Sequence, residues 1–99
     1  MEKSITVKIK TLLEFKRILG ARDISLEIPE GTTVKQLLKI MMEEWGEELA
    51  EALFKPDSQE PVGHIQLIIN GRNIKFLDNL DTILGNEDVF LIFPPAGGG

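Results

Sequence analysis

The chain has no cysteine, no tyrosine, a single tryptophan and a single histidine. Without cysteine it can form no disulfide bond, no thiolate metal site and no thiol nucleophile. If the protein carries sulfur or an activated acyl group, the group must reside on the terminal carboxylate, because no side-chain thiol is available. The histidine, His64, lies in a polar segment, and we interpret it as a surface residue rather than a catalytic base.

The sequence also lacks a long apolar run and an excess of positive charge. No stretch could span a bilayer, and the start Met1-Glu2-Lys3-Ser4 has no signal-peptide core, so we expect a cytoplasmic protein with no membrane partner. Eleven Lys and Arg residues face sixteen Asp and Glu residues, giving a formal charge of −5. Because nucleic-acid binding needs cations that neutralise phosphates, this balance argues against it and favours a basic protein partner.

Residues 1–93 are expected to form one domain with a single core, followed by an extended tail over residues 94–99. Apolar and polar residues alternate in segments 4–10 and 24–28, which predicts two strands that each bury one face. We expect these strands to form an antiparallel pair. The residues between them are predicted to form a packed loop or short helix that ends at Gly20.

The clearest helix follows Pro29-Glu30-Gly31. Thr33 and Gln36 have the spacing of a capping box. The apolar residues that follow recur at helical spacing and predict one buried face: Val34, Leu37, Leu38, Met41 and Trp45. Core packing is preferred for this stripe over a ligand pocket.

A second short helical segment is predicted over residues 47–54, because Gly46 ends the first helix and Pro56 closes the second. Acidic residues gather around this junction: Glu43, Glu44, Glu47, Glu48 and Glu51. They are interpreted as a solvated face, with a docking surface as the alternative.

The second half of the chain is predicted to supply three strands. Residues 65–69 and 72–76 flank Asn70-Gly71, the strongest short hairpin signal. Residues 77–84 form a half-apolar connector with a turn at Asp81 and Thr82. Asp88 and Arg72 are interpreted as solvated loop-edge charges, with partner docking as the alternative.

The last strand, residues 88–93, is apolar on both faces. If Val89, Leu91 and Phe93 face the helix, then Phe90 and Ile92 point to the opposite side. A central strand covered on both faces is the alternative, but so small a domain has little to cover the second face. We therefore expect Phe90 and Ile92 to form part of an exposed apolar patch that contacts a partner.

The chain ends in Pro94-Pro95-Ala96-Gly97-Gly98-Gly99. The prolines lack an amide donor and end strand pairing, and glycine without a Cβ can pass through a channel too narrow for side chains. Such a tail could enter another protein's active site, with Pro94, Pro95, Ala96 and Gly97 bound along the way and Gly98 and Gly99 at the reacting end. From composition alone, a disordered glycine end is favoured over this interpretation, and the family resemblance that follows reverses the preference.

Four segments together resemble the MoaD family, the sulfur-carrier small subunit of molybdopterin synthase, particularly its archaeal-type branch. They are Phe15 with Gly20, the run from Ile28 to Val34, Ile69-Asn70-Gly71-Arg72, and the run from Asp88 to Gly99. The resemblance implies an α+β fold of the β-grasp, ubiquitin-like type, with a mixed sheet packed on one main helix. Gly97 departs from the family pattern, where alanine or serine is more usual.

The resemblance also implies a chemistry. An E1-like adenylating enzyme, using ATP and magnesium, would activate the Gly99 carboxylate, and sulfur would convert it to a thiocarboxylate. The acceptor of that sulfur would be a pterin precursor held by a molybdopterin synthase large subunit, and a molybdenum or tungsten cofactor would be the product. This chain would bind no cofactor and supply no catalytic apparatus of its own.

Two alternatives remain. The chain also resembles the small archaeal modifier proteins, whose activated terminal glycine is joined to lysines of target proteins. A β-grasp interaction domain with an inert tail is the third interpretation.

Overall fold

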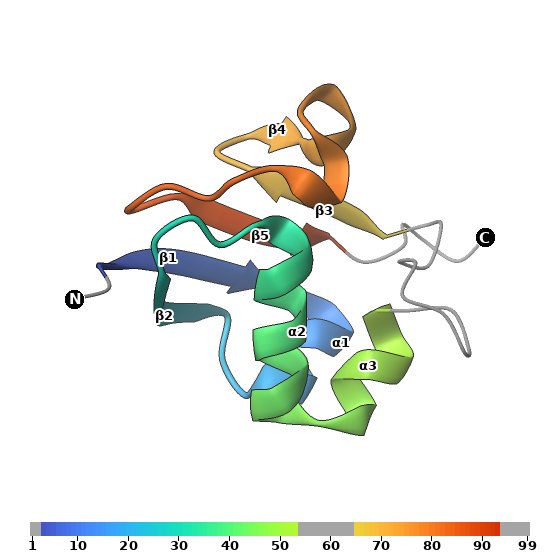
Figure 1. Cartoon of the computed structure of the whole chain (residues 1–99). Coiled ribbons are helices and arrows are strands. Elements are labelled where there is room, and N and C mark those ends of the chain that lie inside the picture. Colours follow the sequence, from blue (N-terminus) through green and yellow to red (C-terminus); the bar gives the residue numbers. More distant parts are fainter. Residues whose placement is uncertain (1–2, 54–64, 94–99) are drawn as a thin grey trace.

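The computed structural model describes residues 3–53 and 65–93, and it contains one mixed sheet with strand order β2-β1-β5-β3-β4. Figure 1 shows the strands stacked from β2 at the bottom to β4 at the top. The strands are β1 (Ser4–Thr11), β2 (Asp23–Pro29), β3 (Gln66–Ile69), β4 (Arg72–Asn73) and β5 (Val89–Phe93). The helices are α1 (Leu13–Leu19), α2 (Val34–Trp45) and α3 (Glu47–Leu53). Within the described ranges, none of the helices is long and apolar enough to cross a bilayer.

The predicted pairing of the first two strands is confirmed. β1 and β2 are antiparallel from Ser4 opposite Pro29 to Lys10 opposite Asp23. The predicted short helix between them is α1, and Gly20 ends it with φ of 85°. This left-handed conformation costs glycine little because it has no Cβ.

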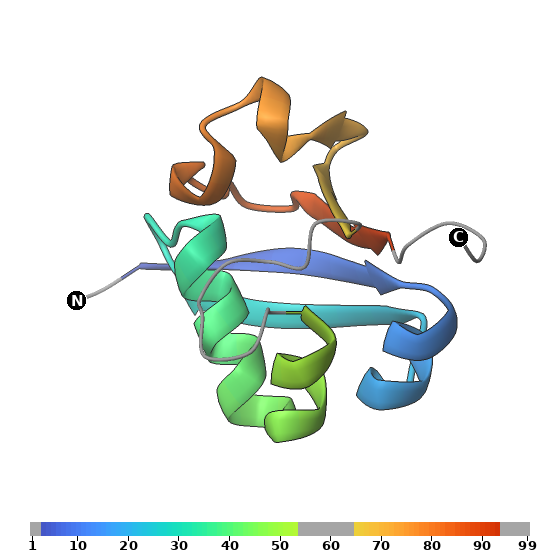
Figure 2. The ribbon, with the colours of Figure 1, turned by 90° about the vertical axis from the view of Figure 1, so that its right-hand side faces the viewer.

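The predicted capping box and buried face of α2 are also confirmed. The Gln36 amide donates to Thr33 Oγ1 at 3.2 Å, and the Thr33 amide donates to Gln36 Oε1 at 3.0 Å. The first four stripe residues are buried and Trp45 is half-buried against the core. Figure 2 shows α2 crossing the strands, so this stripe closes the core against the sheet.

The hairpin at Asn70-Gly71 is confirmed, with φ of 50° and 86° at its two residues. Both values suit the two-residue turns that match strand twist. The strand predicted over residues 72–76 is wrong beyond Asn73, because Ile74–Phe76 form a 3-10 helix, η1. The Asn73 side chain accepts the Lys75 amide at 2.9 Å and starts this turn. A second 3-10 helix, η2 (Asn79–Asp81), occupies the connector.

Candidate functional site

The described part of the domain ends at Phe93, the last residue of β5, which is the middle strand of the sheet. β1 runs parallel to β5 on one side and β3 antiparallel on the other, so that Ile92 stands opposite both Thr11 and Leu67. The predicted tail, residues 94–99, therefore follows a strand that is held on both sides. The tail and His64 lie outside the described residues.

The prediction that Phe90 and Ile92 form an exposed patch is wrong. Both side chains are 0% exposed and belong to the core beneath the helices. The reason is the pairing with β1, since residues opposite each other on paired strands share a face. Phe90 stands opposite Ile9, which faces the helices, so Phe90 must face them too.

The neighbouring residues of β5 occupy the outer face of the sheet instead. Four apolar side chains there form what we term the outer-face patch: Ile68, Val89, Leu91 and Phe93. Three are half-buried and Phe93 is 38% exposed. Leu91 stands opposite Ile68 on one side and Lys10 on the other, and Lys8 stands opposite Val89. The patch is therefore an apolar strip with lysines along one border, and the sequence interpretation missed it.

A hydrogen-bonded turn fixes where β5 begins. Asp88 accepts the Gly85 amide at 2.7 Å and the Asn70 side-chain amide at 2.9 Å. Asn70 in turn accepts the Val89 amide at 2.9 Å. Asp88 thus has a structural role at the hairpin, which corrects its interpretation as a solvated charge. Arg72 is exposed, as predicted.

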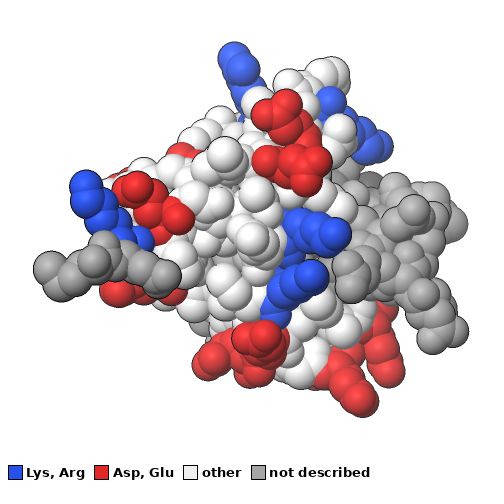
Figure 3. All heavy atoms as spheres, in the orientation of Figure 1, with Lys and Arg blue, Asp and Glu red and all other residues white. Residues whose placement is uncertain are grey.

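The acidic residues predicted to form a solvated face are all exposed. Figure 3 shows acidic side chains along the lower margin, over the end of α2 and over α3. Glu48 pairs with Arg17 on α1 at 3.2 Å, between two exposed side chains. Such exposed pairs contribute little to stability, so this face remains largely hydrated.

The described residues hold no group of three or more His, Cys, Asp or Glu side chains arranged to bind a metal ion. Every buried side-chain nitrogen or oxygen among them has a hydrogen-bond partner. What the described residues offer near the end of β5 is the outer-face patch, on a strand that is paired on both sides.

Several known proteins are similar to this chain in sequence. The model of the ThiS family matches residues 12–99. Small archaeal modifier protein 3 of Haloferax volcanii is 27% identical over 93 residues, covering 94% of this chain and 98% of that protein. A putative sulfur carrier protein of Archaeoglobus fulgidus is 30% identical over 70 residues, covering 71% of this chain and 77% of that protein.

Solved structures of similar proteins have the same fold. Small archaeal modifier protein 1 of Methanosarcina acetivorans superimposes with a TM-score of 0.79 at 27% identity, covering 98% of this chain and 99% of that one. A putative molybdopterin converting factor, subunit 1, of Pyrococcus furiosus gives 0.73 at 26% identity, covering 93% of this chain and 99% of that one. The fold is therefore the expected ubiquitin-like β-grasp. Since the family model spans most of the domain and continues to residue 99, the chain belongs to the ThiS family.

Proposed function

We propose that this protein is a cytoplasmic sulfur carrier whose Gly99 carboxylate is adenylated and then converted to a thiocarboxylate for molybdenum or tungsten cofactor synthesis. The observation that carries the proposal is the family match through Gly99, in a chain with no cysteine. The similarity to a putative sulfur carrier and to a putative molybdopterin converting factor supports the sulfur role.

The chemistry has two steps. A carboxylate is a poor electrophile, because its charge is delocalised and an oxide leaves badly. Attack by a Gly99 carboxylate oxygen on the α-phosphorus of ATP releases pyrophosphate and forms an acyl adenylate. A hydrosulfide ion then attacks the carbonyl carbon, the bond to the phosphate oxygen breaks, AMP leaves, and loss of the S–H proton gives the thiocarboxylate. The catalytic groups and the magnesium ion belong to an E1-like partner.

The outer-face patch is the surface that we propose this partner contacts. It lies on β5 and β3, directly before the tail, so one enzyme can hold the patch and receive Gly99 together. The centre of a protein interface loses its water on binding, and the apolar side chains of the outer-face patch lose little by this. When the thiocarboxylate later gives its sulfur to the pterin precursor, the same surface would face the molybdopterin synthase large subunit.

The experiment that tests the proposal is ATP-dependent AMP transfer by the cognate enzyme to chains with altered ends. Deleting Gly98 and Gly99 should abolish transfer, and so should adding one alanine after Gly99. The control Gly97→Ala should keep transfer, because it changes the tail while leaving the terminal glycine in place. Transfer to the deleted chain at the normal rate would refute the proposal.

A second function is favoured by the similarity to two small archaeal modifier proteins. In this reaction a lysine amine attacks the same acyl adenylate, AMP leaves, and an isopeptide bond forms. Tryptic mapping separates the two functions, since a conjugate leaves a remnant of the tail on a target lysine. If neither activation nor conjugation occurs with the adenylating enzyme present, the inert-tail interaction domain becomes the better account.

A further inference from the structure

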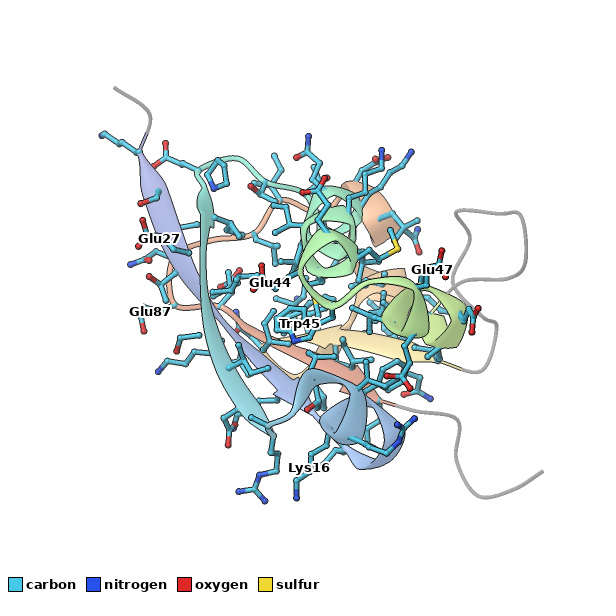
Figure 4. All side chains as sticks on the ribbon, turned by 90° about the horizontal axis from the view of Figure 1, so that it is seen from below. Lys16, Glu27, Glu44, Trp45, Glu47 and Glu87 are labelled. Atoms are coloured by element: carbon cyan, nitrogen blue, oxygen red, sulfur yellow. The ribbon has the colours of Figure 1, made fainter. Side chains whose placement is uncertain are left out.

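β2 forms the lower border of the sheet, and in the described part of the chain it pairs on one side only, with β1. Figure 1 shows it as the lowest strand, and Figure 4 looks onto its open side from below, with the helices standing to one side. An open strand of seven residues is a template for adding another strand.

The backbone groups that face this opening follow from the pairing with β1. The Thr11 amide donates to the Arg22 carbonyl at 2.9 Å, and the Glu30 amide donates to the Lys3 carbonyl at 2.9 Å. Because hydrogen-bonded positions alternate along an antiparallel pair, even-numbered residues of β2 direct their backbone groups to β1. Ser25 and Glu27 therefore direct both N–H and C=O to the opening. Pro29 has no N–H, so the available ladder ends there.

The side chains along the opening are apolar on the helix side. Ile24 and Leu26 are only half-buried, although Ile9 and Val7, which stand opposite them on β1, are 0% exposed. Trp45, at the end of α2, is also half-buried against the core. A strand added here would cover the exposed parts of this apolar border.

The charges around the opening are mostly acidic. Asp23 and Glu27 are exposed on the outer side of β2, and Glu30 and Glu44 are exposed as well. In Figure 4, Glu44 reaches from the end of α2 toward β2. Three cations are near: Arg22 pairs with Asp23 at 3.6 Å, Lys8 pairs with Glu87 at 3.6 Å, and Lys10 stands opposite Asp23. The two lysines lie on β1, on the side of β2 away from the opening.

We propose that the β2 edge is a docking site for an extended, basic segment of a partner protein, which adds antiparallel to β2 as a sixth strand. Apolar residues of the segment contact Ile24, Leu26 and Trp45, and alternate basic residues face Asp23 and Glu27. Main-chain bonds hold the segment, and the side chains select it. The site shares no residue with the outer-face patch and uses no chemistry of Gly99, so it does not depend on the proposed function.

The probe is the capped peptide Lys-Val-Lys-Val-Lys-Val, titrated into the full-length protein and followed by amide NMR. Binding should slow hydrogen exchange at the Ser25 and Glu27 amides. The amides of Ile24 and Leu26 are already bonded to β1 and should not change. The same peptide with glutamate in place of lysine should bind more weakly.

Two N-methylated peptides form a matched pair. In an antiparallel ladder, a probe residue opposite Ser25 or Glu27 has its side chain on the same face of the sheet as that residue and its amide directed to β2. The lysines take these positions, because they are the probe residues that face the acidic side chains. Methylating the lysine amides should weaken binding roughly tenfold or more, while methylating the valine amides should leave it unchanged. This comparison leaves the protein unaltered.

Variants test the same groups from the protein side. Ser25→Pro removes the backbone N–H that points to the opening, whereas Ser25→Ala keeps it. Only the proline variant should therefore fail to bind the probe. Glu27→Gln keeps the oxygen that accepts from Ser4 Oγ at 3.0 Å and removes the charge. It should weaken binding by about two- to fivefold.

Any of three results with the probe would overturn the proposal. The first is no amide protection at roughly millimolar probe, where very weak binding is still detected. The second is equal binding of both N-methylated peptides, and the third is protection of the outer-face patch instead of β2. Protection of Ser25 and Glu27 that rises with protein concentration without any probe would also overturn it. In that case a second copy of this chain, rather than a basic segment, occupies the edge.

Discussion

Phe90 and Leu91 are adjacent in the chain and have opposite roles. Phe90 is fully buried against the helices, whereas Leu91 lies half-buried on the outer face beside Ile68. Replacing Phe90 by a smaller residue creates a cavity in the core, whereas replacing Leu91 alters a half-buried contact on the outer face and leaves the core filled. The two positions therefore separate stability from partner binding.

Phe90→Ala is expected to lower the free energy of unfolding by about 3–5 kcal/mol, because it empties a core site. Leu91→Asp is expected to change stability by less than about 1 kcal/mol. Its KM for AMP transfer should rise roughly tenfold to a hundredfold, because burying a large apolar side chain contributes about 1.5–3 kcal/mol. Urea unfolding and steady-state kinetics measure the two effects.

The control for Leu91→Asp is Ile83→Asp, which places the same charge on a side chain that is 67% exposed on the connector. Its KM should match that of the unaltered protein. An equal rise in KM for both variants would show that added charge, rather than the outer-face patch, weakens binding.

Asp88 is the second informative residue. Asp88→Ala removes the acceptor for both the Gly85 amide and the Asn70 side chain, and should cost about 1–2 kcal/mol of unfolding free energy. Asp88→Asn retains one acceptor oxygen and should cost less. If the alanine variant unfolds at the same urea concentration as the parent, these bonds contribute nothing measurable.

Among the elements, those with an unambiguous polar and apolar pattern were predictable. β1 alternates strictly, and α2 has both a capping box and a single apolar stripe. These local signals agree with the tertiary structure, so β1, β2 and α2 match their predicted positions within one residue or two.

Two features of the elements were not predictable from their own residues. All five residues of β5 are apolar, so the strand has no alternation that reveals which side faces the helices. Its parallel pairing with β1 decides this, and the clear alternation of β1 was the signal that could have shown it. At Ile74–Phe76 the Asn73 side chain overrides a strand-like pattern by starting a tight turn.

The capping box gives a prediction at this scale. Thr33→Ala should lower the free energy of unfolding by about 1 kcal/mol, because it leaves the Gln36 amide without its acceptor at the start of α2. Thr33→Ser keeps the hydroxyl and should retain most of that stability. Urea unfolding of the two variants measures the difference, and equal stability of the alanine variant and the parent would contradict the role of the cap.

At the scale of the whole molecule, the domain holds β5 firmly between two strands and carries the apolar strip directly before the tail. In the proposal, sulfur is carried on the terminal carboxylate of a chain that has no cysteine. Family membership follows from the comparisons, while the tail chemistry rests on the proposal. The central claim is therefore about one atom, the oxygen of Gly99 that sulfur replaces.

The most direct test is intact-mass analysis of the protein purified from its native cells. The account predicts that a fraction of the molecules carries the mass change of one oxygen-to-sulfur exchange, located on Gly99 by fragmentation and lost on hydrolysis of the thioacid. A protein that carries no terminal sulfur, while tail remnants are abundant on lysines of other proteins, would contradict the carrier role and identify the chain as a modifier.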